Sequence, residues 1–151
     1  MKKVMSYFHR AAGVIAFLII LSFFCSTVFV ELQGDPAQIA AVKNYIVSGM
    51  WVLIPCIITA GITGNLMVPG VKGGVIGSKK KRMPFIAVNG LFVLLPSAVY
   101  LNYLASEGQL DTVFYTVQGV ELLAGFINLS LMFLNIRDGF RIVRARSRHQ
   151  S

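Results

Sequence analysis

Charge is what this sequence has least of. Of its 151 residues, 13% are charged and 56% are hydrophobic, whereas about 25% of the residues in an ordinary soluble domain are charged. Its two cysteines are too few for a secreted disulfide scaffold, and its low polarity excludes a disordered chain. These shortages also exclude an ordinary soluble enzyme. They indicate an integral membrane protein.

Long stretches with almost no charge occur four times along the chain. A hydrocarbon core about 30 Å thick requires roughly 20 apolar residues in a helix. The stretches that meet this requirement are residues 11–30, 45–68, 85–104 and 113–134, and only the last contains a charge, Glu121. Because lipid offers no hydrogen-bond partner to open backbone groups, each stretch is predicted to be helical. The sequence therefore predicts an all-α integral membrane protein, an antiparallel four-transmembrane-helix bundle.

The first stretch follows Lys2 and Lys3, as the apolar core of a signal peptide would. It is too long for such a core, however, and no cleavage site of the small-x-small type follows it. We therefore expect an uncleaved first span. The domain organisation that results is a four-span transmembrane domain at residues 1–136 and a short basic tail at residues 137–151.

Basic residues fall almost entirely on one side of the predicted membrane. Of the 14 Lys and Arg residues, 13 lie before the first span, between the second and third, or after the fourth, and Lys43 alone lies on the other side. Lys and Arg accumulate in cytoplasmic loops. The sequence thus predicts a multi-pass protein of the cytoplasmic (inner) membrane of a bacterial type, with both termini cytoplasmic (N-in/C-in).

A run of four cations, Lys79, Lys80, Lys81 and Arg82, is also found in nucleic-acid-binding patches. Between two spans, such a run is a topology signal that contacts anionic lipid headgroups, each residue contributing about 1 kcal/mol. We therefore expect the lipid bilayer as a partner and no nucleic acid. The preceding residues, 69–78, are rich in glycine but match no phosphate-binding spacing, and they are predicted to form a flexible connector.

Glu121 is the one charged residue within a predicted span, and an intramembrane carboxylate is a functional-site candidate. Gln118 precedes it by three residues and Asn128 follows it by seven, so the three share one helix face. A rise of 1.5 Å per residue predicts Thr59 near the depth of Glu121 and Asn89 nearer the cytoplasmic side. These five residues form the predicted buried polar site.

The charge state of Glu121 depends on what surrounds it. Because no Lys or Arg lies within a predicted span, no cation is expected at its depth. We therefore predict that Glu121 is protonated, and that Glu121→Gln folds nearly as well as the wild type. Two interpretations of the polar site stay open, namely hydrogen bonding between helices and the binding of a substrate.

The histidines limit the cofactors that the chain could hold. Only His9 lies near a span, because His149 is in the tail, and haem with two histidine ligands is thereby excluded within one chain. His9 and Asn65, both towards the cytoplasmic side, are possible ligand-binding residues. No metalloprotease, Ser/His/Asp or paired-cysteine pattern occurs. We predict no metal site, and the cofactor is left unknown.

Three functions remain open on the sequence alone. The first is a non-enzymatic accessory or anchor for a partner membrane complex, because the short loops leave no soluble catalytic domain. The second is a proton- or cation-coupled carrier for a small solute that uses Glu121, which would require a homodimer. The third is a redox membrane subunit that binds a quinone, or a haem with His9 as its single protein ligand.

Overall fold

The computed structural model describes residues 1–70 and 72–148, and in these residues it contains helices and no strand. The helices are α1 (Lys2–Gln33), α2 (Pro36–Met67), α3 (Gly74–Asn89), η1 (Gly90–Leu94), α4 (Leu95–Ser106) and α5 (Thr112–Arg148). Because α3, η1 and α4 follow one another without a break, they form a single rod. The described chain thus has four helical rods, each long and apolar enough to cross a membrane, which confirms the prediction of an all-helical chain with four such helices.

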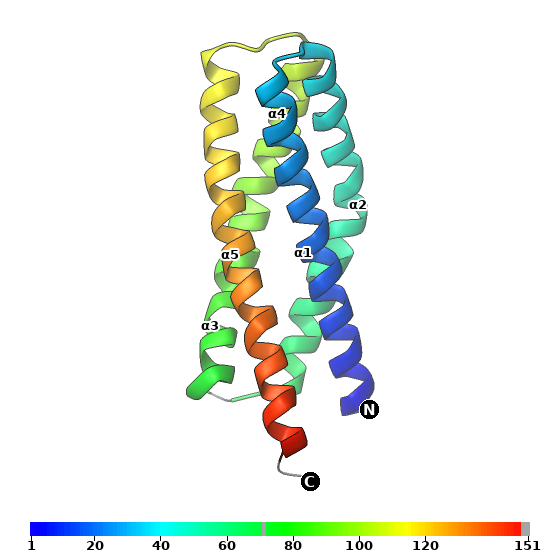
Figure 1. Cartoon of the computed structure of the whole chain (residues 1–151), viewed down its shortest axis with the longest axis vertical. Coiled ribbons are helices and arrows are strands. Elements are labelled where there is room, and N and C mark those ends of the chain that lie inside the picture. The colour runs from blue at the N-terminus through cyan, green and yellow to red at the C-terminus, as the bar shows by residue number, and fades with distance from the viewer. Residues whose placement is uncertain (71, 149–151) are drawn as a thin grey trace.

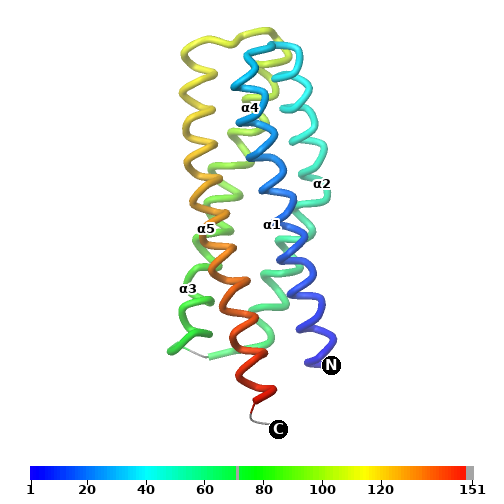
Figure 2. Tube along the Cα trace, viewed as in Figure 1, coloured from blue at the N-terminus to red at the C-terminus, as the bar shows by residue number. Residues whose placement is uncertain are grey.

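The four rods lie side by side along the long axis of the molecule (Figure 1). Both chain termini and the connection between α2 and α3 lie at one end, which we call the terminal end (Figure 2). The α1–α2 turn and the α4–α5 connection lie at the other, which we call the hairpin end. At 1.5 Å per residue, the shortest rods, with 32 residues, are about 48 Å long, so all the rods exceed a hydrocarbon core of about 30 Å.

Two predicted boundaries differ from the observed ones. The flexible connector expected at residues 69–78 is wrong in its second half, because α3 begins at Gly74 and the cationic run at residues 79–82 is helical. In addition, α5 is unbroken from Thr112 to Arg148, so the described part of the basic tail continues the fourth rod. His149 lies outside the described residues.

The turn between α1 and α2 shows how the sequence ends one helix and starts the next. Gly34 has a left-handed conformation (φ 70°), and its N–H donates to the carbonyl of Val30, as is common at helix C-termini. The side chain of Asp35 then accepts a hydrogen bond from the N–H of Ala37 at 3.0 Å, and Pro36 occupies the first position of α2. α2 therefore starts nine residues before the apolar stretch predicted from residue 45.

Buried residues repeat at alternating intervals of three and four along the rods. On α2 the buried stripe consists of Ile39, Lys43, Ile46, Met50 and Leu53. This spacing of 3.5 residues is characteristic of left-handed packing between long helices. The stripe on α2 contains one charged residue, Lys43. Because this stripe packs against the other helices, the side chain of Lys43 lies inside the bundle.

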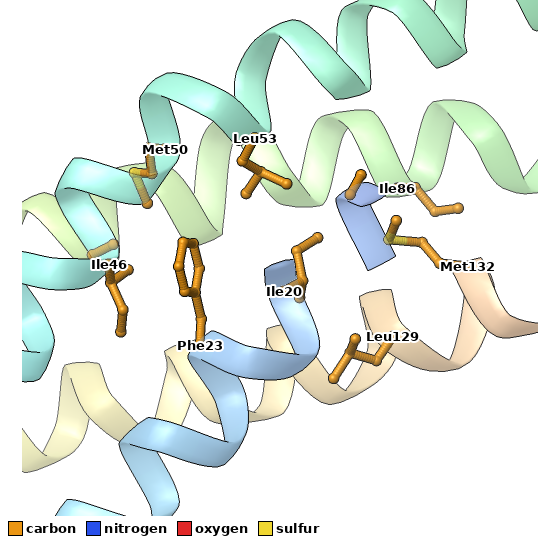
Figure 3. Close-up of a cluster of buried hydrophobic side chains, with 10 residues drawn as sticks. Ile20, Phe23, Ile46, Met50, Leu53, Ile86, Leu129 and Met132 are labelled. Atoms are coloured by element: carbon orange, nitrogen blue, oxygen red, sulfur yellow. The ribbon is translucent and has the colours of Figure 1, made fainter. Parts of the chain in front are cut away.

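The largest apolar cluster lies in the middle of the bundle (Figure 3). Its labelled members come from all four rods: Ile20, Phe23, Ile46, Met50, Leu53, Ile86, Leu129 and Met132. Phe23 packs onto Gly49, where an added Cβ would lie 2.5 Å from the ring. Glycine at this position thus allows α1 and α2 to approach closely.

Candidate functional site

A buried ion pair joins α2 to α5 in the hairpin half of the bundle. Lys43 Nζ donates a hydrogen bond to Glu121 Oε2 at 2.8 Å, and the two side chains are 0% and 11% exposed. Lys43 lies seven residues after Pro36 and Glu121 nine after Thr112. At 1.5 Å per residue, both residues lie roughly 10–14 Å from the hairpin ends of their helices.

This ion pair corrects the prediction that no cation lies at the depth of Glu121. Lys43 precedes the apolar stretch 45–68 and is therefore expected at the outer surface, but it lies on the buried stripe of α2, which begins at Pro36. Thr59, predicted at the depth of Glu121, follows Lys43 by 16 residues and is thus about 24 Å away along the helix. The structure therefore removes the reason for a protonated Glu121 and does not bring Thr59 to the site.

Gln118, one turn from Glu121, is buried (3% exposed), and neither of its amide atoms has a hydrogen-bond partner among the described residues. Oε1 of Glu31, in the last turn of α1, is likewise buried and without a partner. Glu31 is close enough to interact electrostatically with Lys43 and with Glu121. Polar groups from α1 and α5 therefore lie near the ion pair.

An amide pair joins the third and fourth rods in the middle of the bundle. Asn89 Nδ2 donates to Asn128 Oδ1 at 3.0 Å and to the carbonyl of Ala124 at 2.9 Å. Asn128 is fully buried and in turn donates to the carbonyl of Ile86 at 3.4 Å. The π-helical turn η1 begins directly after Asn89. Two of the predicted site residues thus meet, and their amide groups hold α3 against α5.

A second set of charges joins α3 to α5 in the terminal half. Arg82 Nη1 donates to Asp138 Oδ2 at 2.7 Å, and Arg137 donates to the other carboxylate oxygen at 3.1 Å. Asp138 is buried and lies beyond the predicted end of the fourth span at residue 134. The hydrogen bond from Arg82 lowers the pKa of the Asp138 carboxyl from its ordinary value. One member of the predicted lipid-contacting run, Arg82, is therefore engaged within the bundle.

A cavity of about 130 Å³ lies between α1, α2, α3 and α5 in the terminal half, and His9 is part of its wall. His9 Nδ1 lies 2.9 Å from the carbonyl oxygen of Ala60. Because a carbonyl can only accept, Nδ1 carries the proton, and in the neutral ring Nε2 keeps a free lone pair. Asn65, predicted as a possible partner of His9, is exposed and does not line the cavity.

Sequence reasoning missed several residues of these sites, and Lys43 and Lys79 matter most. Lys43 could have been found from its place on the apolar stripe of α2. Lys79 was assigned to lipid headgroups as part of a run, and nothing in the sequence showed that its side chain would line the cavity. Comparisons with protein-family models, with curated proteins and with solved structures found no match to this chain. The functional argument therefore depends on the geometry.

Proposed function

We propose that this chain is a multi-pass protein of the cytoplasmic membrane, an antiparallel four-helix bundle with both termini in the cytoplasm. Support comes from the 13 basic residues on one predicted side and from the two termini lying at one end (Figure 1). Alkaline phosphatase is active only when exported. Fusions at Gly34 and Gly108 are expected to be active and a fusion at Gly77 silent; the opposite pattern would reverse the orientation.

We further propose that the bundle acts as a non-enzymatic accessory or anchor for a partner membrane complex. The observation that carries this proposal is the Lys43–Glu121 ion pair. A carrier that binds a cation at Glu121 needs a carboxylate that is free to take up and release its substrate, whereas Lys43 Nζ occupies this carboxylate at 2.8 Å. The Lys43–Glu121 and Asn89–Asn128 pairs instead tie helices together, which suits a bundle of fixed shape.

The partner can be sought by photo-crosslinking in intact cells. A photoreactive phenylalanine analogue is placed at one exposed aromatic position of each rod, namely Phe29, Trp51, Phe92 and Phe126. A partner that docks on one side gives an adduct of a single mass from one rod or two neighbouring rods. Leu101, which is fully buried, is the matched control and should give none. Absence of a protein adduct at all four exposed positions would contradict an accessory role.

The carrier alternative predicts a different result. Purified protein in liposomes would show proton or cation flux that disappears in Glu121→Gln and persists in Glu107→Gln, since Glu107 is exposed outside the bundle. We expect no flux above empty liposomes for either variant or for the wild type. Flux that depends on Glu121 would replace the accessory proposal with a carrier.

A further inference from the structure

Small residues from two helices line the cavity in the terminal half. Gly13 on α1 and Gly61 on α2 both line the cavity, and a Cβ added at either would meet no atom within 4 Å. Gly49, in contrast, is packed against Phe23. The open space at Gly13 and Gly61 is thus a local feature and not a general looseness of the bundle. An engineered apolar cavity of about 150 Å³ binds benzene, so 130 Å³ has room for a similarly small apolar group.

The lining of this cavity changes from charged to apolar along the bundle axis. Arg10 and Lys79 line it towards the terminal end. Ala16 on α1 and Ile86 on α3 line it six and seven residues further along their helices, about 9–10 Å nearer the middle of the bundle. A lipid in a bilayer has the same polarity gradient, with its head at the surface and its chain directed towards the midplane.

Among the described residues, the cationic groups of the cavity form no ion pair. Lys79 Nζ reaches across to α5, where it lies 3.3 Å from the position that a Cβ on Gly139 would take. Among the described residues Lys79 makes no ion pair, since the nearby Asp138 is bound by Arg82 and Arg137. Arg10 donates only to the carbonyl of Ser6 in its own helix. Lys79 is half-buried and makes no ion pair, so it favours an anion beside it, and the exposed Arg10 also lines the cavity.

We propose that this cavity binds a membrane amphiphile with an oxyanion head, whose carboxylate or phosphate is held by Lys79 and Arg10 and whose first chain carbons enter the apolar part. A fatty acid and an anionic phospholipid share this chemistry. The proposal goes beyond an accessory role and does not depend on it, because it requires only that the bundle lies in a membrane. Binding requires both the apolar part of the cavity and the two cations, Lys79 and Arg10.

Binding can be measured through a single tryptophan on the cavity wall. The variant Trp51→Phe/Phe140→Trp places the only tryptophan at a lining position, and the protein is reconstituted in nanodiscs of zwitterionic phosphatidylcholine. The probes are a fatty acid and a phosphatidic acid, each brominated on the chain carbons nearest its head, together with the brominated alcohol of equal length. Bromine quenches tryptophan on contact. We expect saturable quenching by the acids at mole fractions at least tenfold below those needed for the alcohol.

Substitutions separate the role of the cavity from that of the charge. Gly13→Leu and Gly61→Leu fill the space from two different helices and should each abolish saturable quenching. Gly119→Leu is the matched control, because an added Cβ at Gly119 also meets nothing within 4 Å but Gly119 lies outside the cavity lining. Lys79→Gln should weaken binding about tenfold, as expected for the loss of one charge-assisted hydrogen bond, whereas Lys81→Gln, at an exposed position outside the lining, should have no effect.

The remaining arms identify the ligand. Stronger quenching by the fatty acid than by the phosphatidic acid assigns the head as a carboxylate, and the reverse order assigns it as a phosphate. Displacement of the probe by millimolar inorganic phosphate alone would overturn the proposal in favour of a simple anion site. The proposal would also be overturned if a short-chain quinone gave saturable quenching and neither acid did. The cavity would then be a site for a neutral ring. Unchanged quenching in both leucine variants would show that the cavity is not the binding site.

Discussion

Removal of one member of the Lys43–Glu121 pair should destabilise the bundle strongly. At 2.8 Å, the Coulomb attraction is about 6 kcal/mol with an effective dielectric constant of 20, and the desolvation of both groups opposes it. Truncation of one partner of a buried pair costs about 3–5 kcal/mol in soluble proteins. In Glu121→Gln, the side-chain carbonyl can still accept a hydrogen bond from Lys43. We therefore expect losses of about 3 kcal/mol for Lys43→Met and about 2 kcal/mol for Glu121→Gln.

The double variant makes this prediction specific to the pair. Replacement of both partners by apolar residues of similar size is often neutral, so Lys43→Met/Glu121→Leu should lie within about 1 kcal/mol of the wild type. The free energy of unfolding can be measured by steric trapping in micelles. The exposed residues Lys81 and Glu107 provide the control substitutions Lys81→Met and Glu107→Gln. If both single variants at the pair stay within about 0.5 kcal/mol of the wild type, as exposed substitutions do, the ion pair does not stabilise the fold.

Three further predictions concern other contacts of the bundle. Asn128→Ala should lower the free energy of unfolding by about 1 kcal/mol, the scale of an interhelical hydrogen bond in a membrane, and a loss above about 3 kcal/mol would indicate a different role. Gly49→Ala should lower the free energy of unfolding by about 1–3 kcal/mol, because the added methyl group overpacks against Phe23. Gly119→Ala should not lower it, because a Cβ at Gly119 meets nothing within 4 Å. Equal effects of the two substitutions would contradict the packing argument. The pKa of the Asp138 carboxyl is lower in the folded state than in the unfolded state. Its ionisation should therefore stabilise the fold above pH about 4, and this stabilisation should be lost as the pH falls through the lowered pKa. The free energy of unfolding of Asp138→Asn should not show this pH dependence in the same titration.

The sequence predicts the four rods because membrane spanning depends on length and apolarity, which can be read locally. It does not predict the ion pair. Gly34, Asp35 and Pro36 indicate a helix start before the apolar stretch, but a count of apolar residues places the first turns of this helix, with Lys43, at the outer surface and not in the bundle. The alternating intervals of three and four through Ile39 and Ile46 place Lys43 on the buried face, so this signal was available. Asn89 and Asn128 were both predicted to belong to the buried polar site, but their mutual bond depends on the register between two rods, which the sequence does not contain.

The cavity could not be predicted from the sequence, for a related reason. Gly13 and Gly49 are both glycines within apolar helices, yet one faces open space and the other supports an aromatic ring. Whether a glycine faces open space depends on the side chains of the neighbouring helix, and no local sequence pattern shows which side chains these are.

The two halves of the bundle use their buried charge in different ways. Lys43 and Glu121 in the hairpin half neutralise each other across α2 and α5, so separating these helices would leave two charges without a partner. In the terminal half, Asp138 is shared by Arg82 and Arg137, and within the described part of the chain Lys79 and Arg10 at the cavity form no ion pair. A ligand could therefore enter and leave this half while the ion pair in the other half keeps the rods in place. This division predicts that Lys79→Gln weakens amphiphile binding without loss of stability, whereas Lys43→Met lowers stability throughout the bundle. If Lys79→Gln lowered the free energy of unfolding as much as Lys43→Met does, Lys79 would be a structural cation and the division between the two halves would not hold.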